Sequence, residues 1–126
     1  MKKIKLFIAL FTVTLMVNAQ IVTPQPSPSA KMDQKVGLTD VSLEYSRPNM
    51  RGRTIFGDLV PYGTLWRLGA NANTKITFSD DFSVGEKTLK AGSYAIFATP
   101  NEKSWDVVFY SDTDNWGTPQ KWDDAK

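Results

Sequence analysis

The feature that most restricts the fold of this chain is a hydrophobic pattern with a period of two residues. In residues 41–46, VSLEYS, apolar and polar side chains alternate at every position. Successive side chains of a strand point to opposite faces, whereas a helix repeats about every 3.6 residues. The alternation therefore predicts a strand with one buried and one wet face.

Six other segments have the length and composition of short strands and are separated by Gly, Pro, Asn or Asp. They are residues 31–36, 75–78, 82–84, 87–89, 93–99 and 105–110. Gly85-Glu86 has the spacing of a tight hairpin turn, and a short loop joins 93–99 to 105–110. Both of these last segments are apolar enough to be buried strands, with 93–99 in the centre of a sheet.

This pattern predicts an all-β fold: an antiparallel β-sandwich of about six to eight short strands, with a closed barrel as the alternative. One long loop rich in Arg and Gly, residues 46–74, interrupts the strands. A short helical turn is expected within it at 55–60.

The first residues have the pattern of a secretory signal peptide. A basic start, MKKIK, precedes twelve mostly apolar residues and the small residues Val17-Asn18-Ala19, so we expect cleavage after Ala19. A membrane anchor is the alternative, but a bilayer span needs about 20 apolar residues. We expect a signal peptide at 1–19, a Pro/Ser-rich tether at 20–30 and one domain at 31–126. The mature protein would be periplasmic or extracellular, with no stable membrane span.

Cleavage would remove three lysines and leave 15 − 3 = 12 basic residues against 13 acidic ones, a net charge of −1. This balance excludes a general electrostatic affinity for nucleic acid. The sequence contains no Cys and no His. It can therefore form no disulfide, Ser-His-Asp triad, Cys-His dyad, or zinc site with thiolate or imidazole ligands. We expect no catalytic residues, no metal and no cofactor.

The last residues, 112–126, are polar apart from Trp116 and Trp122 and include no closing strand. Two tryptophans in a polar segment are expected to pack against the domain. We expect the chain to be a fragment that lacks one or two final strands, so that the domain is incomplete at its C-terminus and exposes a sheet edge.

Several motifs together resemble a known family. They are SRP at 46–48, GR-x-IFG at 52–57, LVPYG-x-x-W-R-x-GAN at 59–71, AGSY at 91–94 and NWG at 115–117. From about Ser29 onward the chain resembles the secreted bacterial domain of unknown function 2911 family. The resemblance implies an exported β-rich domain, usually one that continues beyond this length, and it implies no activity.

The first candidate site is the arginine loop, residues 46–74, which contains all four arginines of the chain: Arg47, Arg51, Arg53 and Arg67. Guanidinium groups match the geometry of carboxylate and phosphate, and loops held by a sheet are where binding residues concentrate. The loop is therefore a candidate pocket for an anion or an acidic glycan. In the alternative, the same groups bind the loop's own carbonyls and nearby Asp58, Glu44 and Asp40.

Trp66, Asn71 and Asn73 are the second candidate, because an indole can stack on a sugar and amides can bind hydroxyls. The alternative is structural: Trp66 anchors the loop, and the asparagines occupy turn positions with positive φ. A wider aromatic groove would combine Trp66 with Tyr62, Trp116 and Trp122.

Carboxylates are the remaining catalytic option. Asp80-Asp81 and Asp123-Asp124 are adjacent pairs that suit solvated turns, while Asp58 and Asp106 could face each other across a cleft. Residues 112–115, DTDN, contain part of a calcium-loop pattern without its Gly and final acidic ligand. The sequence thus favours a non-catalytic exported domain that binds an anionic or carbohydrate ligand, or an envelope partner, through the arginine loop. A carboxylate-based glycan hydrolase and a purely structural envelope module are the alternatives.

Overall fold

The computed structural model of the chain describes residues 23–123, and the expected signal peptide lies outside the described residues. Within this range the structure consists of strands and loops without a helix, which confirms the all-β prediction. The strands are β1 (Ser29–Val36), β2 (Thr39–Ser46), β3 (Lys75–Phe78), β4 (Phe82–Val84), β5 (Lys87–Leu89), β6 (Gly92–Pro100) and β7 (Trp105–Tyr110). β1 begins two residues before the expected domain start.

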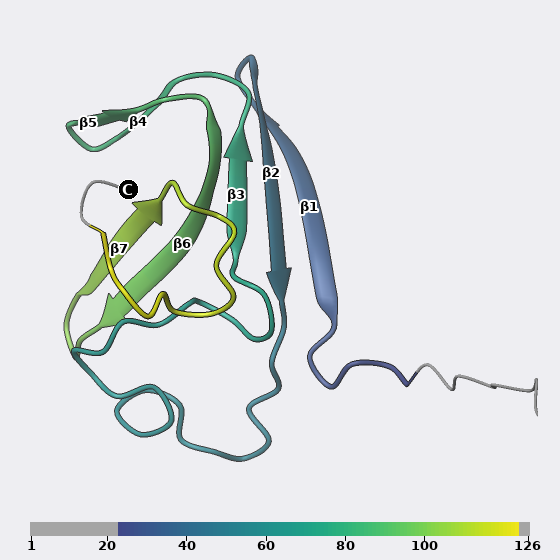
Figure 1. Cartoon of the computed structure of the whole chain (residues 1–126), viewed down its shortest axis with the longest axis vertical. Coiled ribbons are helices and arrows are strands. Elements are labelled where there is room, and N and C mark those ends of the chain that lie inside the picture. The colour runs from purple at the N-terminus through teal and green to yellow at the C-terminus, as the bar shows by residue number, and fades with distance from the viewer. Residues whose placement is uncertain (1–22, 124–126) are drawn as a thin grey trace, which may run out of the picture.

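The strands form two antiparallel sheets (Figure 1). The larger has five strands in the order β1-β2-β3-β6-β7, and the smaller is the β4–β5 hairpin. The larger sheet does not close on itself, because β1 and β7 are its two edges. β6 is central, as predicted. The prediction of a buried β7 is wrong, because β7 is an edge strand and Trp105 and Val107 in its first half are 44% and 54% exposed.

The first face of the large sheet packs against the small sheet. The strand register places Leu43, Ile76 and Tyr94 side by side on this face. From β4, Phe82 stacks on Phe78 with ring centroids 3.6 Å apart and makes edge contacts with Tyr94. Edge and stacked contacts between rings add to the area that they bury. Phe82 therefore joins the small sheet to the large one through ring contacts.

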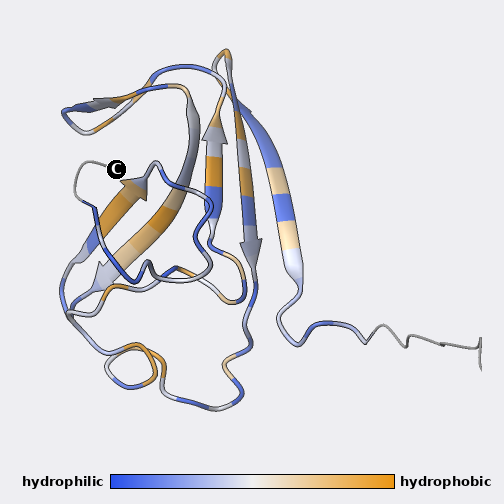
Figure 2. Cartoon of the chain, viewed as in Figure 1, coloured by the Kyte–Doolittle hydropathy of each residue, from blue (hydrophilic) through white to orange (hydrophobic). Residues whose placement is uncertain are grey.

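The second face contains the fully buried core. Ala95 and Phe97 of β6 have no exposed surface, and Tyr110 of β7 has 3%. Trp122 covers them, with its ring 5.6 Å from Phe97 and stacked 4.4 Å from Tyr110. The C-terminal segment, residues 111–123, thus crosses β6 and β7, and the colouring of Figure 2 shows the most apolar stretch of the sheet on these strands. The expectation that both tryptophans pack holds for one only, since Trp116 is 73% exposed.

The arginine loop lies along one end of the large sheet (Figure 1). Trp66 exchanges two backbone hydrogen bonds with Ala98, of 2.7 and 2.8 Å, and so extends the ladder of β6 beyond the end of β3. The helical turn expected at 55–60 is wrong. The N–H of Val60 donates to the carbonyl of Ile55, five residues back, and Phe56 forms a bridge with Val60, so this segment is a wide turn.

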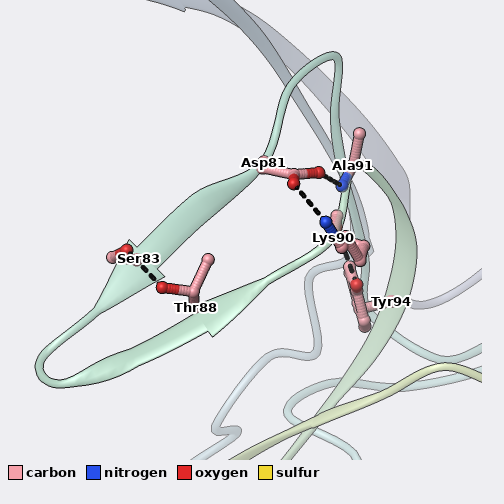
Figure 3. Close-up of polar contacts among 6 residues, drawn as sticks. All are labelled: Asp81, Ser83, Thr88, Lys90, Ala91 and Tyr94. Atoms are coloured by element: carbon pink, nitrogen blue, oxygen red, sulfur yellow. Dashed lines mark hydrogen bonds and ion pairs between the residues drawn. The ribbon is translucent and has the colours of Figure 1, made fainter.

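Polar contacts hold the β4–β5 hairpin at its base (Figure 3). The carboxylate of Asp81 accepts hydrogen bonds from Lys90 Nζ at 2.7 Å and from the N–H of Ala91 at 2.9 Å. The Lys90 hydrogen bond, followed by the Ala91 N–H, lowers the pKa of Asp81, and the same carboxylate raises the pKa of Lys90. The Tyr94 hydroxyl donates to the carbonyl of Lys90, so this base is tied to β6.

Candidate ligand-binding site

The four arginines differ in their surroundings. Arg47, Arg51 and Arg53 are exposed, whereas Arg67 is half-buried. Arg53 binds its own loop, because Nε donates to the carbonyl of Met50 at 3.0 Å and Nη2 to that of Asn49 at 2.9 Å. One of the four guanidinium groups therefore has the structural role that the alternative interpretation assigned to all of them.

The carboxylates expected to bind the arginines are engaged elsewhere. Glu44 pairs with Lys75 at 3.5 Å, and Asp40 pairs with Lys35 at 2.9 Å. Within residues 23–123 no arginine forms an ion pair with an acidic side chain. The charge of the loop is therefore not neutralised by the described part of the domain.

A pocket of about 700 Å³ opens beneath the arginine loop. Two basic side chains line it, Arg53 and Arg67. Its other large lining side chains are apolar: Met50, Ile55, Phe56, Leu59, Val60, Leu65 and Trp66. The lining contains no acidic residue. A mostly apolar cavity with a few polar groups is the usual form of a small-molecule site, and we call it the arginine pocket.

Arg67 is the residue whose donors are available in this pocket. Among residues 23–123 its guanidinium makes no hydrogen bond and no ion pair. It lies against the backbone of Gly117, where an added Cβ would approach Arg67 Nη1 to 2.9 Å. Gly117 also has a φ of +74°, a conformation that favours glycine. Because Gly117 has no side chain, the C-terminal segment makes room for the Arg67 guanidinium.

The aromatic side chains around Trp66 are not the expected ones. Its ring makes edge contacts with Phe56 at 5.9 Å and Trp105 at 6.1 Å. Trp122 is in the core on the second face and Trp116 is exposed, so the predicted groove of Trp66, Tyr62, Trp116 and Trp122 is wrong. The sequence signal for Phe56 is the presence of apolar residues at 55–60 inside a polar loop, a pattern that predicts a helical turn.

The two asparagines hold the loop to neighbouring segments. Asn71 has the expected positive φ, +59°, whereas the same expectation for Asn73 is wrong. The Nδ2 of Asn71 donates to Gln25 Oε1 and to the carbonyl of Ser27. The residues just before β1 are thereby attached to the loop. Asn73 Nδ2 donates to the carbonyl of Asn115 at 2.9 Å, which attaches the C-terminal segment. Neither asparagine lines the arginine pocket.

The carboxylate candidates do not converge on the arginine pocket. Asp81 belongs to the base of the hairpin, and Asp112 accepts a hydrogen bond from the N–H of Asp114 within a turn. Neither Asp58 nor Asp106 lines the pocket. Within the described range 23–123, no group of three or more acidic residues is placed to hold a metal ion.

The fold and pocket define an all-β domain in which a loop beside the sheet builds a cationic, largely apolar cavity. A family model described as "Protein of unknown function (DUF2911)" matches residues 27–126, and the chain belongs to this family. Curated proteins and solved structures give no match. Across residues 23–123 no helix has the length and apolar character required to cross a membrane.

Proposed function

We propose that this domain is a binding module whose arginine pocket holds a small organic anion with an apolar body, such as an aromatic or branched carboxylate. The observation that carries the proposal is that the half-buried residue Arg67 lines an apolar pocket and its guanidinium has no partner among the described residues. A charged group in such surroundings is stabilised by an anion that accepts its hydrogen bonds.

The composition of the pocket favours an anion with an apolar body over a highly hydroxylated one. Phe56, Leu59 and Leu65 offer no hydrogen bonds, so the hydroxyls of an acidic glycan would lose water without replacement there. An aromatic or aliphatic body would instead bury apolar surface, and each Å² buried stabilises the complex by about 25 cal/mol. Its carboxylate would meet Arg67, with Arg53 as a second positive charge near it.

Binding of 2-naphthoate and its neutral amide, 2-naphthamide, tests the proposal by isothermal titration calorimetry. We expect the carboxylate to bind and the amide to bind at least about tenfold more weakly, because a hydrogen bond to a charged group contributes about 1.5–3 kcal/mol. Glucuronate is the comparison ligand, because it has the same carboxylate on a hydroxylated body in place of an apolar one. If glucuronate binds and 2-naphthoate does not, the assigned ligand class is wrong.

Arg67→Met and Arg47→Met form a matched pair, since both remove a guanidinium from the same loop but Arg67 lines the pocket and Arg47 does not. Arg67→Met should weaken 2-naphthoate binding about tenfold or more and change the free energy of unfolding by less than about 1 kcal/mol. Arg47→Met should change neither quantity. Equal losses of affinity in both variants would show that the anion binds the general charge of the loop.

Gly117→Ala tests the position of the Arg67 side chain without removing its charge. The added methyl group would lie 2.9 Å from Nη1, so the guanidinium must move. We expect 2-naphthoate affinity to fall while the neutral amide binds as before. Unchanged carboxylate affinity would contradict a positioned Arg67.

We further propose that the mature domain acts in the periplasm or outside the cell and has no catalytic role. The support is the signal-peptide pattern of residues 1–19 and the absence of Cys and His from the sequence. Expression of the full chain in a bacterial host, followed by N-terminal sequencing of the periplasmic fraction, tests the location. The expected first residue is Gln20, and a cytoplasmic product that retains Met1 would contradict it.

A further inference from the structure

Residues 67–73 leave the large sheet and return to it, and we call them the pocket loop. Just before them, Trp66 exchanges backbone hydrogen bonds with Ala98 of β6. Just after them, the carbonyl of Thr74 accepts a 2.8 Å hydrogen bond from the N–H of Ile96, which also belongs to β6. Both ends of the pocket loop are therefore anchored to the same central strand.

The backbone of the pocket loop is fixed where it lines the arginine pocket. Arg67 and Gly69 line this pocket and flank Leu68, whose φ of +55° is rare for a bulky residue. The Thr74 hydroxyl donates to the Leu68 carbonyl at 2.9 Å. A Cβ on Gly69 would lie 3.2 Å from both Thr74 Oγ1 and the carbonyl oxygen of Ser46. These contacts leave the pocket loop little room to rearrange, so it is a firm support for a segment that binds to it.

The residues before β1, 23–28, are such a segment, and we call them the N-terminal segment. Asn71 Nδ2, from the pocket loop, donates to Gln25 Oε1 at 3.0 Å and to the carbonyl of Ser27 at 3.1 Å. The N–H of Arg47 donates to the carbonyl of Pro28 at 2.9 Å. Ser27 is half-buried and lines the arginine pocket. The end of the Pro/Ser-rich tether thus supplies part of the pocket wall.

The N-terminal segment is attached by few contacts. Its sequence is TPQPSP, and all of its residues except Ser27 are exposed. A hydrogen bond stabilises a folded segment only slightly, because the released segment bonds to water instead. Ordering each residue costs a comparable amount of free energy, which the fixed φ of proline reduces. The docked and released states therefore differ little in free energy, and a ligand that contacts the segment can shift their balance.

We propose that the N-terminal segment is a strap whose docking is coupled to occupancy of the arginine pocket. A ligand in the pocket contacts the wall at Ser27 and holds the segment on Asn71, and release of the segment removes this wall and weakens binding. The coupling rests on the proposed function, because it regulates the same pocket. It is also reciprocal: docking raises ligand affinity by the same factor by which the ligand favours docking.

Asn71→Gly in the mature protein tests the coupling, because it removes the amide while glycine accepts the φ of +59°. We expect the heteronuclear NOE of the Gln25 and Ser27 amides, which reports fast backbone motion, to fall in NMR spectra. The affinity for 2-naphthoate, measured by calorimetry, should fall about fivefold or more. Saturating 2-naphthoate should recover part of the lost NOE.

Arg51→Gly is the matched control. Arg51 is an exposed residue of the arginine loop with a φ of +51°, and it does not line the pocket. This variant should change neither the NOE values nor the affinity. Equal losses in Arg51→Gly and Asn71→Gly would overturn the coupling, because any added glycine in the loop would then have the same effect.

The remaining outcomes separate the coupling from the proposed function. If 2-naphthoate does not bind the wild type, both are wrong. If it binds the wild type and Asn71→Gly equally well while the NOE values fall, the coupling alone is wrong. NOE values that do not fall in Asn71→Gly would also overturn the coupling, because the Asn71 amide would then not hold the segment.

Discussion

The large sheet and the arginine loop are stabilised in different ways. The sheet is held by continuous backbone ladders and by the buried side chains of Ala95, Phe97 and Tyr110. The loop is held by isolated hydrogen bonds, such as those between Trp66 and Ala98, and much of its apolar surface is exposed. Stability is therefore concentrated in the sheet, while unused hydrogen-bond donors and open apolar surface are concentrated in the loop.

The largest expected difference comes from removing one phenylalanine ring in each region. Phe97 is fully buried and Phe56 is 40% exposed. Phe97→Ala should destabilise the fold by about 4 kcal/mol, because it leaves a cavity in the core, and Phe56→Ala by about 1 kcal/mol. Urea unfolding followed by tryptophan fluorescence measures both. Equal losses would mean that the loop contributes to the core as much as the sheet does.

The C-terminal segment gives a smaller contrast between two tryptophans. Trp122→Ala should lower the free energy of unfolding by about 2 kcal/mol, because the Trp122 ring packs on Phe97 and Tyr110. Trp116→Ala should change it by less than about 0.5 kcal/mol, because Trp116 is exposed. Thermal unfolding by circular dichroism measures the difference. If Trp116→Ala is the more damaging change, the segment does not cover the second face in solution as described.

The smallest expected effect concerns the hairpin and depends on pH. The hydrogen bond from Lys90 lowers the pKa of Asp81, so its folded-state pKa lies below its unfolded value. The stabilising contribution is then present above the unfolded pKa and is lost as pH falls through the folded pKa. Asp81→Asn should lower the unfolding midpoint slightly near neutrality, and its difference from the wild type should vanish in strong acid.

Asp58→Asn in the arginine loop is the control for this pH series, because Asp58 is an exposed acidic residue with no ion pair among residues 23–123. It should match the wild type at every pH. NMR titration of the Asp81 carboxyl group gives an independent check. A folded-state pKa at or above its ordinary value would contradict the role assigned to the Lys90 contact.

Local patterns predicted the strands well and the arginine loop poorly. The hairpin β4–β5 and the strand β7 lie at the predicted residues, because a period of two and turn residues are properties of neighbouring positions. The wide turn at 55–60 is closed by backbone hydrogen bonds within 54–60, a pattern that its apolar residues do not distinguish from a helical turn. The ring contacts of Trp66 with Phe56 and Trp105 join residues that are 10 and 39 positions apart. No local pattern specifies which of several aromatic side chains will meet.

The sequence by itself determined an all-β chain, the short turns between its strands, and the exclusion of histidine and cysteine chemistry, since these follow from residue type and spacing. Only the tertiary structure decided that Arg67 lies in an apolar pocket while Arg53 binds its own loop, and that Trp122 is packed while Trp116 is exposed. The physical reason is that burial and partner choice depend on which distant strands and loops the sheet brings together.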